Sequence, residues 1–164
     1  MSSKNRLARV VATIENRVPP GLRKHALSIA LGKTVKLVGT AGVECLELTT
    51  HKSVFRIKNR KKVQNHIQGI HAAGMALVAE TATGMVLGMS IPDDKIPVLK
   101  SMHVDYLKRC KGDLTAVASL SDEQIEKIKT TEKGDVNVQV TCTDSENKET
   151  IQATMIWAWT LKRR

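Results

Sequence analysis

The chain has 164 residues, of which 41% are hydrophobic, and a formal net charge of +10 at pH 7. This length favours one domain with a sizeable core, and the charge favours an anionic partner, such as a phosphate-bearing ligand, an acidic membrane surface or nucleic acid. Four aromatic residues are too few for a base-stacking platform, which argues against binding of single-stranded nucleic acid.

Cysteine usage and the amino-terminal composition bear on where the protein acts. Cys45, Cys110 and Cys142 are odd in number and contain no CxxC pair, so reduced thiols are expected, and neither a disulfide framework nor a zinc site. We expect no secretory segment and no integral membrane span. The first 30 residues hold six bases and one acid. This composition fits an organelle transit peptide or an amphipathic helix of the folded domain. We favour the helix, and we expect a cytoplasmic location, with a mitochondrial or other organelle matrix as the alternative.

Residues 1–42 are predicted to form a helical extension that packs on a domain of residues 43–164. Apolar residues recur with helical spacing in Asn5–Asn16 and again in Leu22–Leu31, with a Pro-Pro-Gly interruption at 19–21. We expect these helices to cover one end of the fold.

A β-hairpin is predicted next, with strands over Val43–Leu48 and Ser53–Arg60. Five bases lie within seven residues in this region, without an acid: Arg56, Lys58, Arg60, Lys61 and Lys62. They form either a solvated edge that discourages aggregation or a phosphate site, for which Arg60 and Lys61 are the candidates because the run leads into Asn65.

A buried helix follows, and the chain is organised around it. The segment from His71 to Ile91 carries one formal charge in 21 residues, that of Glu80. Its composition predicts a helix over His71–Thr83 and a strand over Met85–Ile91, and the helix is judged too short to cross a bilayer. A lone carboxylate on an apolar helix is costly, so Glu80 either caps a backbone group or reaches solvent, or it belongs to a site.

Four more strands and one short helix complete the predicted α+β domain. The strands are Leu99–Leu107, Leu114–Leu120, Val136–Thr143 and Thr150–Leu161, and the helix runs from its cap at Ser121 to about Thr130. The last two strands alternate apolar and polar residues, which predicts one face packed on a helix. A curved antiparallel sheet around one long apolar helix satisfies these burial demands.

Three polar residues around the central helix have a suggestive spacing. Asn65 lies six residues before His71, and Glu80 lies nine after it. At a helix start, free backbone N–H groups and the helix dipole favour an anion or a polarised carbonyl oxygen. The arrangement therefore offers a carbonyl-polarising donor and, from a second subunit, a carboxylate.

Asn65, His71 and Glu80 correspond to the Asn, His and acidic positions of a pattern like N-x5-H-G-G-x7-D/E, with six residues in place of seven before the acid. The chain therefore resembles the hotdog-fold acyl-CoA thioesterases, especially their phenylacetyl-CoA-thioesterase-like branch. The resemblance covers roughly residues 43–161, and Ala72-Ala73 replaces the Gly-Gly of many members. It implies hydrolysis of a fatty or aryl acyl-CoA by a homodimer or a dimer of dimers, with active sites at the shared interface. It implies no cofactor other than the CoA of the substrate.

The resemblance also implies roles for individual residues. The Ala72 N–H would polarise the thioester carbonyl, Glu80 would act as general base or nucleophile, and Asn65 would hold water or the thioester. His71 would orient the loop or bind substrate, or would be a structural residue of the helix start. The candidates for further substrate contacts are His66, Gly74, Lys108, Arg109 and Lys111, the last three meeting the CoA phosphates.

Two other function classes stay open. A non-catalytic acyl-CoA or lipid-binding hotdog protein would fit a neutral, buried Glu80 and the Ala72-Ala73 pair. A basic nucleic-acid binder would fit the net charge, but no recognition-helix pattern supports it and we expect no nucleic acid partner. No metal site is expected because the chain has no HExxH motif, and Cys110 has no sequence signature of a nucleophile.

Overall fold

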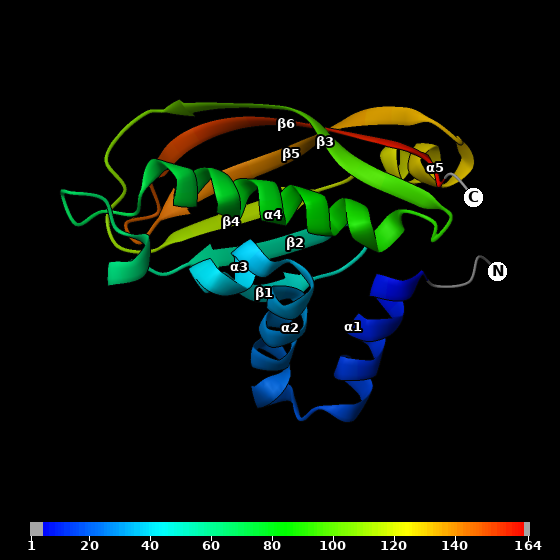
Figure 1. The fold of residues 1–164 in the computed structure, drawn as a ribbon, viewed down its shortest axis with the longest axis horizontal. Coiled ribbons are helices and arrows are strands. Elements are labelled where there is room, and N and C mark those ends of the chain that lie inside the picture. The colour runs from blue at the N-terminus through cyan, green and yellow to red at the C-terminus, as the bar shows by residue number, and fades with distance from the viewer. Residues whose placement is uncertain (1–4, 163–164) are drawn as a thin grey trace.

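The computed structural model describes residues 5–162 of the chain. The elements occur in the order α1 (Arg6–Arg17), α2 (Pro20–Thr34), α3 (Lys36–Ala41), β1 (Glu44–Leu48), β2 (Lys52–Ile57), a 3-10 turn (Lys61–Val63), α4 (Ala72–Ser90), β3 (Lys95–Tyr106), β4 (Leu114–Ser119), α5 (Asp122–Thr130), β5 (Gly134–Asp144) and β6 (Glu149–Leu161). The strands form one antiparallel sheet, in the order β1-β2-β4-β5-β6-β3, that curves around α4 (Figure 1). The predicted α+β class and hotdog arrangement are confirmed.

The central helix α4 is longer than predicted. It continues to Ser90, so the strand predicted over Met85–Ile91 is wrong, and four strands follow the helix in the described chain. A short apolar run fits a helix or a strand equally well, so its periodicity is not decisive. Gly84 does not break the helix but lets the Trp157 ring pack on it, since a Cβ there would lie 2.6 Å from Trp157 Cζ2. The helix ends just before Pro92, which has no N–H to continue it.

The helix α4 is not too short to cross a bilayer, as its predicted length suggested. Among residues 5–162, this 19-residue helix is long and apolar enough to cross a membrane, and half of the qualifying segment is buried within the molecule. Residues such as Val78, Ala79 and Leu87 are fully enclosed. Packing inside the sheet therefore accounts for the apolar composition, and the expectation of no membrane span stays a prediction.

Three other elements differ from the sequence prediction. β3 begins at Lys95 and contains Pro97, which an edge strand accommodates because its outer N–H groups need no ladder partner. β2 ends at Ile57, and the Asn59 N–H donates instead to Asp113 Oδ1 at 3.0 Å. The short helix α3 was not predicted.

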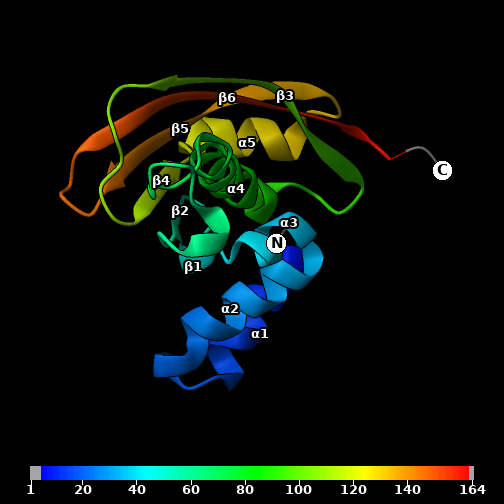
Figure 2. The same ribbon diagram turned by 60° about the vertical axis from the view of Figure 1, so that its left-hand side comes forward.

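The helices α1 and α2 form a hairpin that projects from the sheet (Figure 1 and Figure 2). Asn5 fastens α1 to the end of α4. Its Oδ1 accepts from the Ala8 N–H at 2.8 Å, while its Nδ2 donates to the Gly88 carbonyl at 2.8 Å and the Ile91 carbonyl at 2.6 Å. One side chain thus satisfies the start of one helix and the end of another. The division into an extension of residues 1–42, whose first four lie outside the described residues, and a domain of residues 43–164 stays a prediction.

We expect Asn5→Ala to lower the free energy of unfolding by about 1–2 kcal/mol, because a helix cap and two partly buried carbonyls lose their partner. Urea denaturation followed by circular dichroism would measure this change. The matched control is Asn16→Ala, at an exposed position of the same helix, for which we expect a change within about 0.5 kcal/mol. Equal losses for both variants would contradict the role of Asn5.

Candidate active site

A cavity of about 420 Å³ lies at the amino-terminal end of α4. The loop before α4, the first turn of α4, the end of β3 and the turn after β3 form its walls. Its lining residues are Asn65, Ile67, Gly69, Ile70, Ala72, Met75, Tyr106, Lys108, Arg109 and Cys110. Four residues predicted for the site meet here, from two segments that lie far apart in the sequence: Asn65 and Ala72 from one, Lys108 and Arg109 from the other.

The first turn of α4 leaves one backbone donor available at this cavity. The Gly74 and Met75 N–H groups donate to the His71 carbonyl at 2.8 and 3.1 Å. The Ala73 N–H donates to Nδ1 of His71, the N-cap residue, at 3.1 Å. The Ala72 N–H donates to none of the described residues. The helix start therefore offers its dipole and one free N–H at the position predicted for the oxyanion donor.

His71 has a structural role at the helix start. Because its Nδ1 accepts a hydrogen bond, the neutral ring carries its proton on Nε2. Its backbone N–H donates to the Val63 carbonyl at 2.8 Å, which anchors the loop before the helix. A direct contact of His71 with substrate stays a prediction. His66 is exposed on the same loop and does not line the cavity.

Asn65 shapes the loop that precedes α4. Its backbone N–H donates to the Gly69 carbonyl at 2.9 Å, and its Oδ1 accepts from the Ile67 and Gly69 N–H groups, each at 3.1 Å. Its Nδ2 donates to no partner within residues 5–162. The side-chain oxygen is thus committed to the loop, and the amide nitrogen remains as a donor in the cavity wall.

Tyr106 was not singled out from the sequence as a site residue, although it lines the cavity. Its hydroxyl donates to the Ala72 carbonyl at 2.9 Å and joins the end of β3 to the first residue of α4. Partial burial raises the pKa of Tyr106, so the phenol keeps its proton, and hence this hydrogen bond, at neutral pH. The available signal was the single tyrosine of the chain, placed at a strand end just before a basic turn.

The basic turn after β3 divides into two parts. Lys108 and Arg109 line the cavity, and Arg109 Nη2 donates to the Ile67 carbonyl across it at 3.0 Å. Lys111 instead pairs with Glu146 of the β5–β6 turn at 3.0 Å and does not line the cavity. Burial raises the pKa of the Cys110 thiol to about 11, so Cys110 is a thiol and not a thiolate at neutral pH.

Three other predicted substrate-binding residues lie outside the cavity. Arg60 pairs with Glu44 at 3.3 Å, and Lys61 is exposed on the 3-10 turn. Gly74 faces the core, where a Cβ would lie 3.3 Å from Ile70 and 3.4 Å from Ile57. The structure does not bring these residues to the Ala72 N–H.

Glu44 forms ion pairs with three of the five bases in the run Arg56–Lys62. Arg56 and Lys58 each lie 2.8 Å from its carboxylate, in addition to Arg60. Burial opposes ionisation of Glu44, but the hydrogen bonds from Lys58 and Arg56 outweigh it and hold the pKa of this carboxyl below its usual range. Three bases of the run are thus engaged by one acid at the β1 edge of the sheet.

Glu80 lies about 12 Å along the helix axis from Ala72, given a rise of about 1.5 Å per residue, and does not line the cavity. Its side chain is half-buried, and burial raises the pKa of its carboxyl. None of the described cations pairs with it. Reacting groups must approach within about 3.5 Å, so Glu80 and the Ala72 N–H of one chain cannot act on the same thioester carbon.

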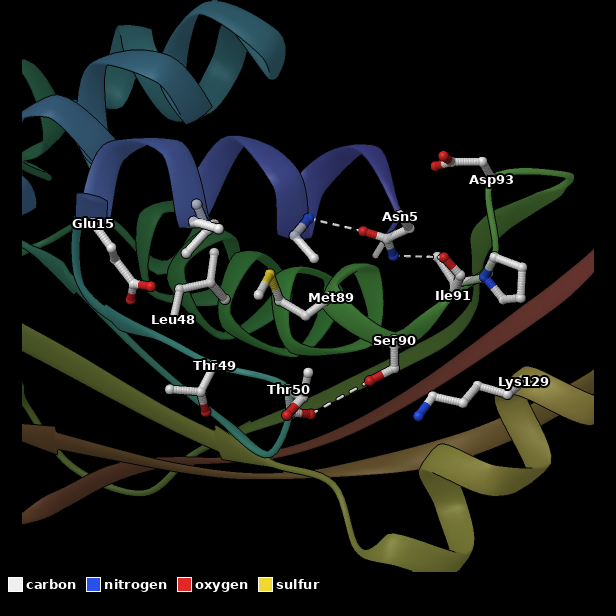
Figure 3. Close-up of a pocket in the computed structure, with 14 residues that line it drawn as sticks. Asn5, Glu15, Leu48, Thr49, Thr50, Met89, Ser90, Ile91, Asp93 and Lys129 are labelled. Atoms are coloured by element: carbon white, nitrogen blue, oxygen red, sulfur yellow. Dashed lines mark hydrogen bonds between the residues drawn. The ribbon is translucent and has the colours of Figure 1, made fainter. Parts of the chain in front are cut away.

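A second cavity, of about 410 Å³, lies at the opposite end of α4 (Figure 3). Leu48 and Met89 line its apolar side, and the Ser90 hydroxyl donates to the Thr50 carbonyl at 3.5 Å. None of the residues predicted for the site lines this cavity. The chemistry predicted from the sequence therefore concentrates at the amino-terminal end of α4.

A family model described as a domain of unknown function (DUF4442) matches residues 23–159. The chain belongs to this family. The DUF4442 match begins within α2 and ends within β6, so it includes part of the helical extension. No curated protein matches the chain significantly.

Solved structures share the fold at low sequence identity. PA5026 from Pseudomonas aeruginosa, a protein of unknown function named a probable thioesterase, is 20% identical, with a TM-score of 0.75 over 88% of this chain and 97% of that chain. Thioesterase HI1161 from Haemophilus influenzae is 14% identical, with a TM-score of 0.66 over 84% of this chain and 90% of that chain. A mutant of the thioesterase SAV0944 from Staphylococcus aureus is 15% identical, with a TM-score of 0.62 over 78% of this chain and 99% of that chain. These similarities establish the shared hotdog fold.

Proposed function

We propose that the protein hydrolyses acyl-CoA thioesters as a homodimer or a dimer of dimers. The observation that carries this proposal is the free Ala72 N–H at the start of α4, in the wall of a cavity that also holds Lys108 and Arg109. Several proteins of similar structure are named thioesterases or a probable thioesterase, which supports the proposal. The proposal requires no cofactor besides the CoA of the substrate, and it places the protein in the cytoplasm or an organelle matrix.

The proposed chemistry uses two groups of α4, the Ala72 N–H from one copy of the chain and the Glu80 carboxylate from another. The Ala72 N–H of one copy donates to the thioester carbonyl oxygen, a type of contact worth roughly 3–4 kcal/mol in the transition state. As general base, Glu80 of the other copy removes a proton from water, the resulting hydroxide adds to the carbonyl carbon, and the C–S bond breaks as the proton passes to the departing CoA sulfur. As nucleophile, Glu80 attacks the carbonyl carbon and the C–S bond breaks to release CoA; water then hydrolyses the acyl-glutamyl anhydride, which releases the carboxylic acid and restores Glu80. Asn65 Nδ2 donates to the water or to the thioester.

The edge strand β3 supports the proposed pairing of two copies. β3 ends the sheet, and Ile96, Val98 and Met102 are exposed along it. A long edge with exposed apolar side chains favours pairing with another strand. We propose that β3 pairs with β3 of a second copy, which would complete the site that one chain leaves incomplete.

Release of free thiol from short, medium, long and aromatic acyl-CoA esters would test the proposed activity. We expect hydrolysis of at least one class, and the ranking of rates identifies the acyl group. Absence of hydrolysis with every ester, together with measurable binding of the same esters, would overturn the proposal in favour of a non-catalytic acyl-CoA-binding protein.

We expect the Lys108→Gln/Arg109→Gln variant to raise KM for an acyl-CoA by about fivefold or more, because the CoA phosphates lose nearby cations. KM for the matching acyl-pantetheine, which lacks the nucleotide, should change little. Lys111→Gln is the matched control, since Lys111 pairs with Glu146 away from the cavity. Equal effects on both substrates would contradict a phosphate-binding role for Lys108 and Arg109.

A further inference from the structure

The extension formed by α1, α2 and α3 presents apolar side chains that no described part of the chain covers. Leu22 and Leu37 are 58% and 61% exposed, and three others are also exposed: Val10, Ile29 and Val35. A second group of exposed apolar side chains lies on and just after β3, where the proposed second copy would cover much of it. The segment that leads into β3 touches the start of α1 through Asp93 and Arg9, but α2 projects away from β3 (Figure 1 and Figure 2). A contact along β3 therefore does not account for the exposed side chains of α2.

The same extension is strongly basic. Between residues 5 and 42 there is one acid, Glu15, and there are seven bases, namely Arg6, Arg9, Arg17, Arg23, Lys24, Lys33 and Lys36. Within the described chain, Arg17, Lys24, Lys33 and Lys36 form no ion pair with a carboxylate. Their charge is therefore available to an anionic partner.

One exposed face of α2 carries both apolar and basic side chains. Leu22 and Ile29 are seven residues apart, so they share one face of the helix, and Lys33 follows on that face. The turn before Leu22 reads Val-Pro-Pro-Gly at 18–21, carries no charge, and is bounded by Arg17 and Arg23. Exposed aliphatic side chains among lysines and arginines are typical of helices that lie in the interface of a lipid bilayer.

We propose that the α1–α3 extension binds the surface of membranes that are rich in anionic lipids. α2 lies along the surface, Leu22 and Leu37 enter the headgroup region, and Lys33 and Lys36 contact the anionic headgroups. This inference rests on the extension alone and is independent of the proposed thioesterase activity.

Cosedimentation of the full chain with vesicles tests the proposal. We expect partitioning onto phosphatidylcholine vesicles that contain about 30% phosphatidylserine, and at least about tenfold weaker partitioning onto phosphatidylcholine alone. Raising NaCl from about 0.1 M to about 0.5 M should weaken binding, because the Debye length shrinks. Leu22→Ser/Leu37→Ser and Lys33→Gln/Lys36→Gln should each lower the partition coefficient by about tenfold.

Matched variants outside the extension serve as controls. Leu107→Ser/Leu161→Ser removes two exposed leucines, and Lys129→Gln/Lys133→Gln removes the charge of two exposed lysines that form no ion pair within the described chain. Both should retain wild-type partitioning. The proposal is overturned if the control variants lose binding as much as the extension variants, or if neither vesicle binds the protein. It is also overturned if Leu22→Ser/Leu37→Ser leaves partitioning intact but changes the mass by light scattering, which would assign this face to a contact between copies.

Discussion

Glu80→Gln is expected to lower kcat for acyl-CoA hydrolysis by about a thousandfold while leaving KM nearly unchanged. Glutamine keeps the shape of the side chain but neither accepts a proton from water nor attacks a carbonyl, and such proton transfers contribute about 10²- to 10⁴-fold. Thiol release under saturating substrate would measure the loss. Wild-type turnover in this variant would remove Glu80 from the proposed mechanism.

The melting temperature of Glu80→Gln shows whether a loss of activity comes from the missing carboxylate or from unfolding. Burial raises the pKa of Glu80, so the folded chain keeps this proton to a higher pH than the unfolded chain does. Ionised Glu80 therefore costs stability as the pH rises through its folded pKa, and glutamine removes that cost. We expect the variant to melt no lower than wild type at pH 7. Glu126→Gln, at an exposed position of α5, is the matched control and should keep full activity.

The pH dependence of the rate follows from the same pKa shift. A carboxylate that acts as base or nucleophile must be ionised, so kcat should fall as the pH falls through the raised pKa of Glu80. The midpoint should lie above the usual range for a glutamate. A midpoint at the usual value would contradict the assignment of Glu80 to the rate-determining ionisation.

Ala72→Pro is expected to lower kcat by about 10²- to 10³-fold, the usual effect of removing one oxyanion donor. Proline deletes the backbone N–H at this position and is tolerated at the first residue of a helix, where α2 already carries Pro20. His71 has φ of −60° and ψ of 142°, a conformation that suits a residue before proline. The substitution therefore targets the proposed donor with little demand on the fold.

Two controls accompany this variant in the thiol-release assay. Ala72→Gly keeps the N–H and should retain most of the activity. Asp122→Pro places proline at the first residue of α5, away from the cavity, and should leave kcat unchanged. If Ala72→Pro turned over at the wild-type rate with an unchanged melting temperature, the carbonyl oxygen would have another donor.

Local sequence chemistry determined much of the fold. Ser121 and Gln124 form the predicted capping box of α5, with hydrogen bonds of 3.2 and 3.0 Å. The alternation that ends in Trp157 and Trp159 places both rings in the core, as expected for a strand with one covered face. These features were predictable because a cap and a period-two pattern each depend on residues a few positions apart.

The tertiary structure decided the length of α4 and the composition of the cavity. Met85–Ser90 is helical, and Gly84 lets the helix pack against Trp157, a residue 73 positions later that no local pattern reveals. Lys108 and Arg109 reach the cavity while Lys111 turns to Glu146, although all three lie in one basic turn. Asn65, His71 and Glu80 could be selected by spacing. The hydrogen bond from the Tyr106 hydroxyl to the Ala72 carbonyl, in contrast, depends on how β3 meets the helix start. Spacing along the chain thus determined which groups are available, and long-range packing determined which of them share a cavity.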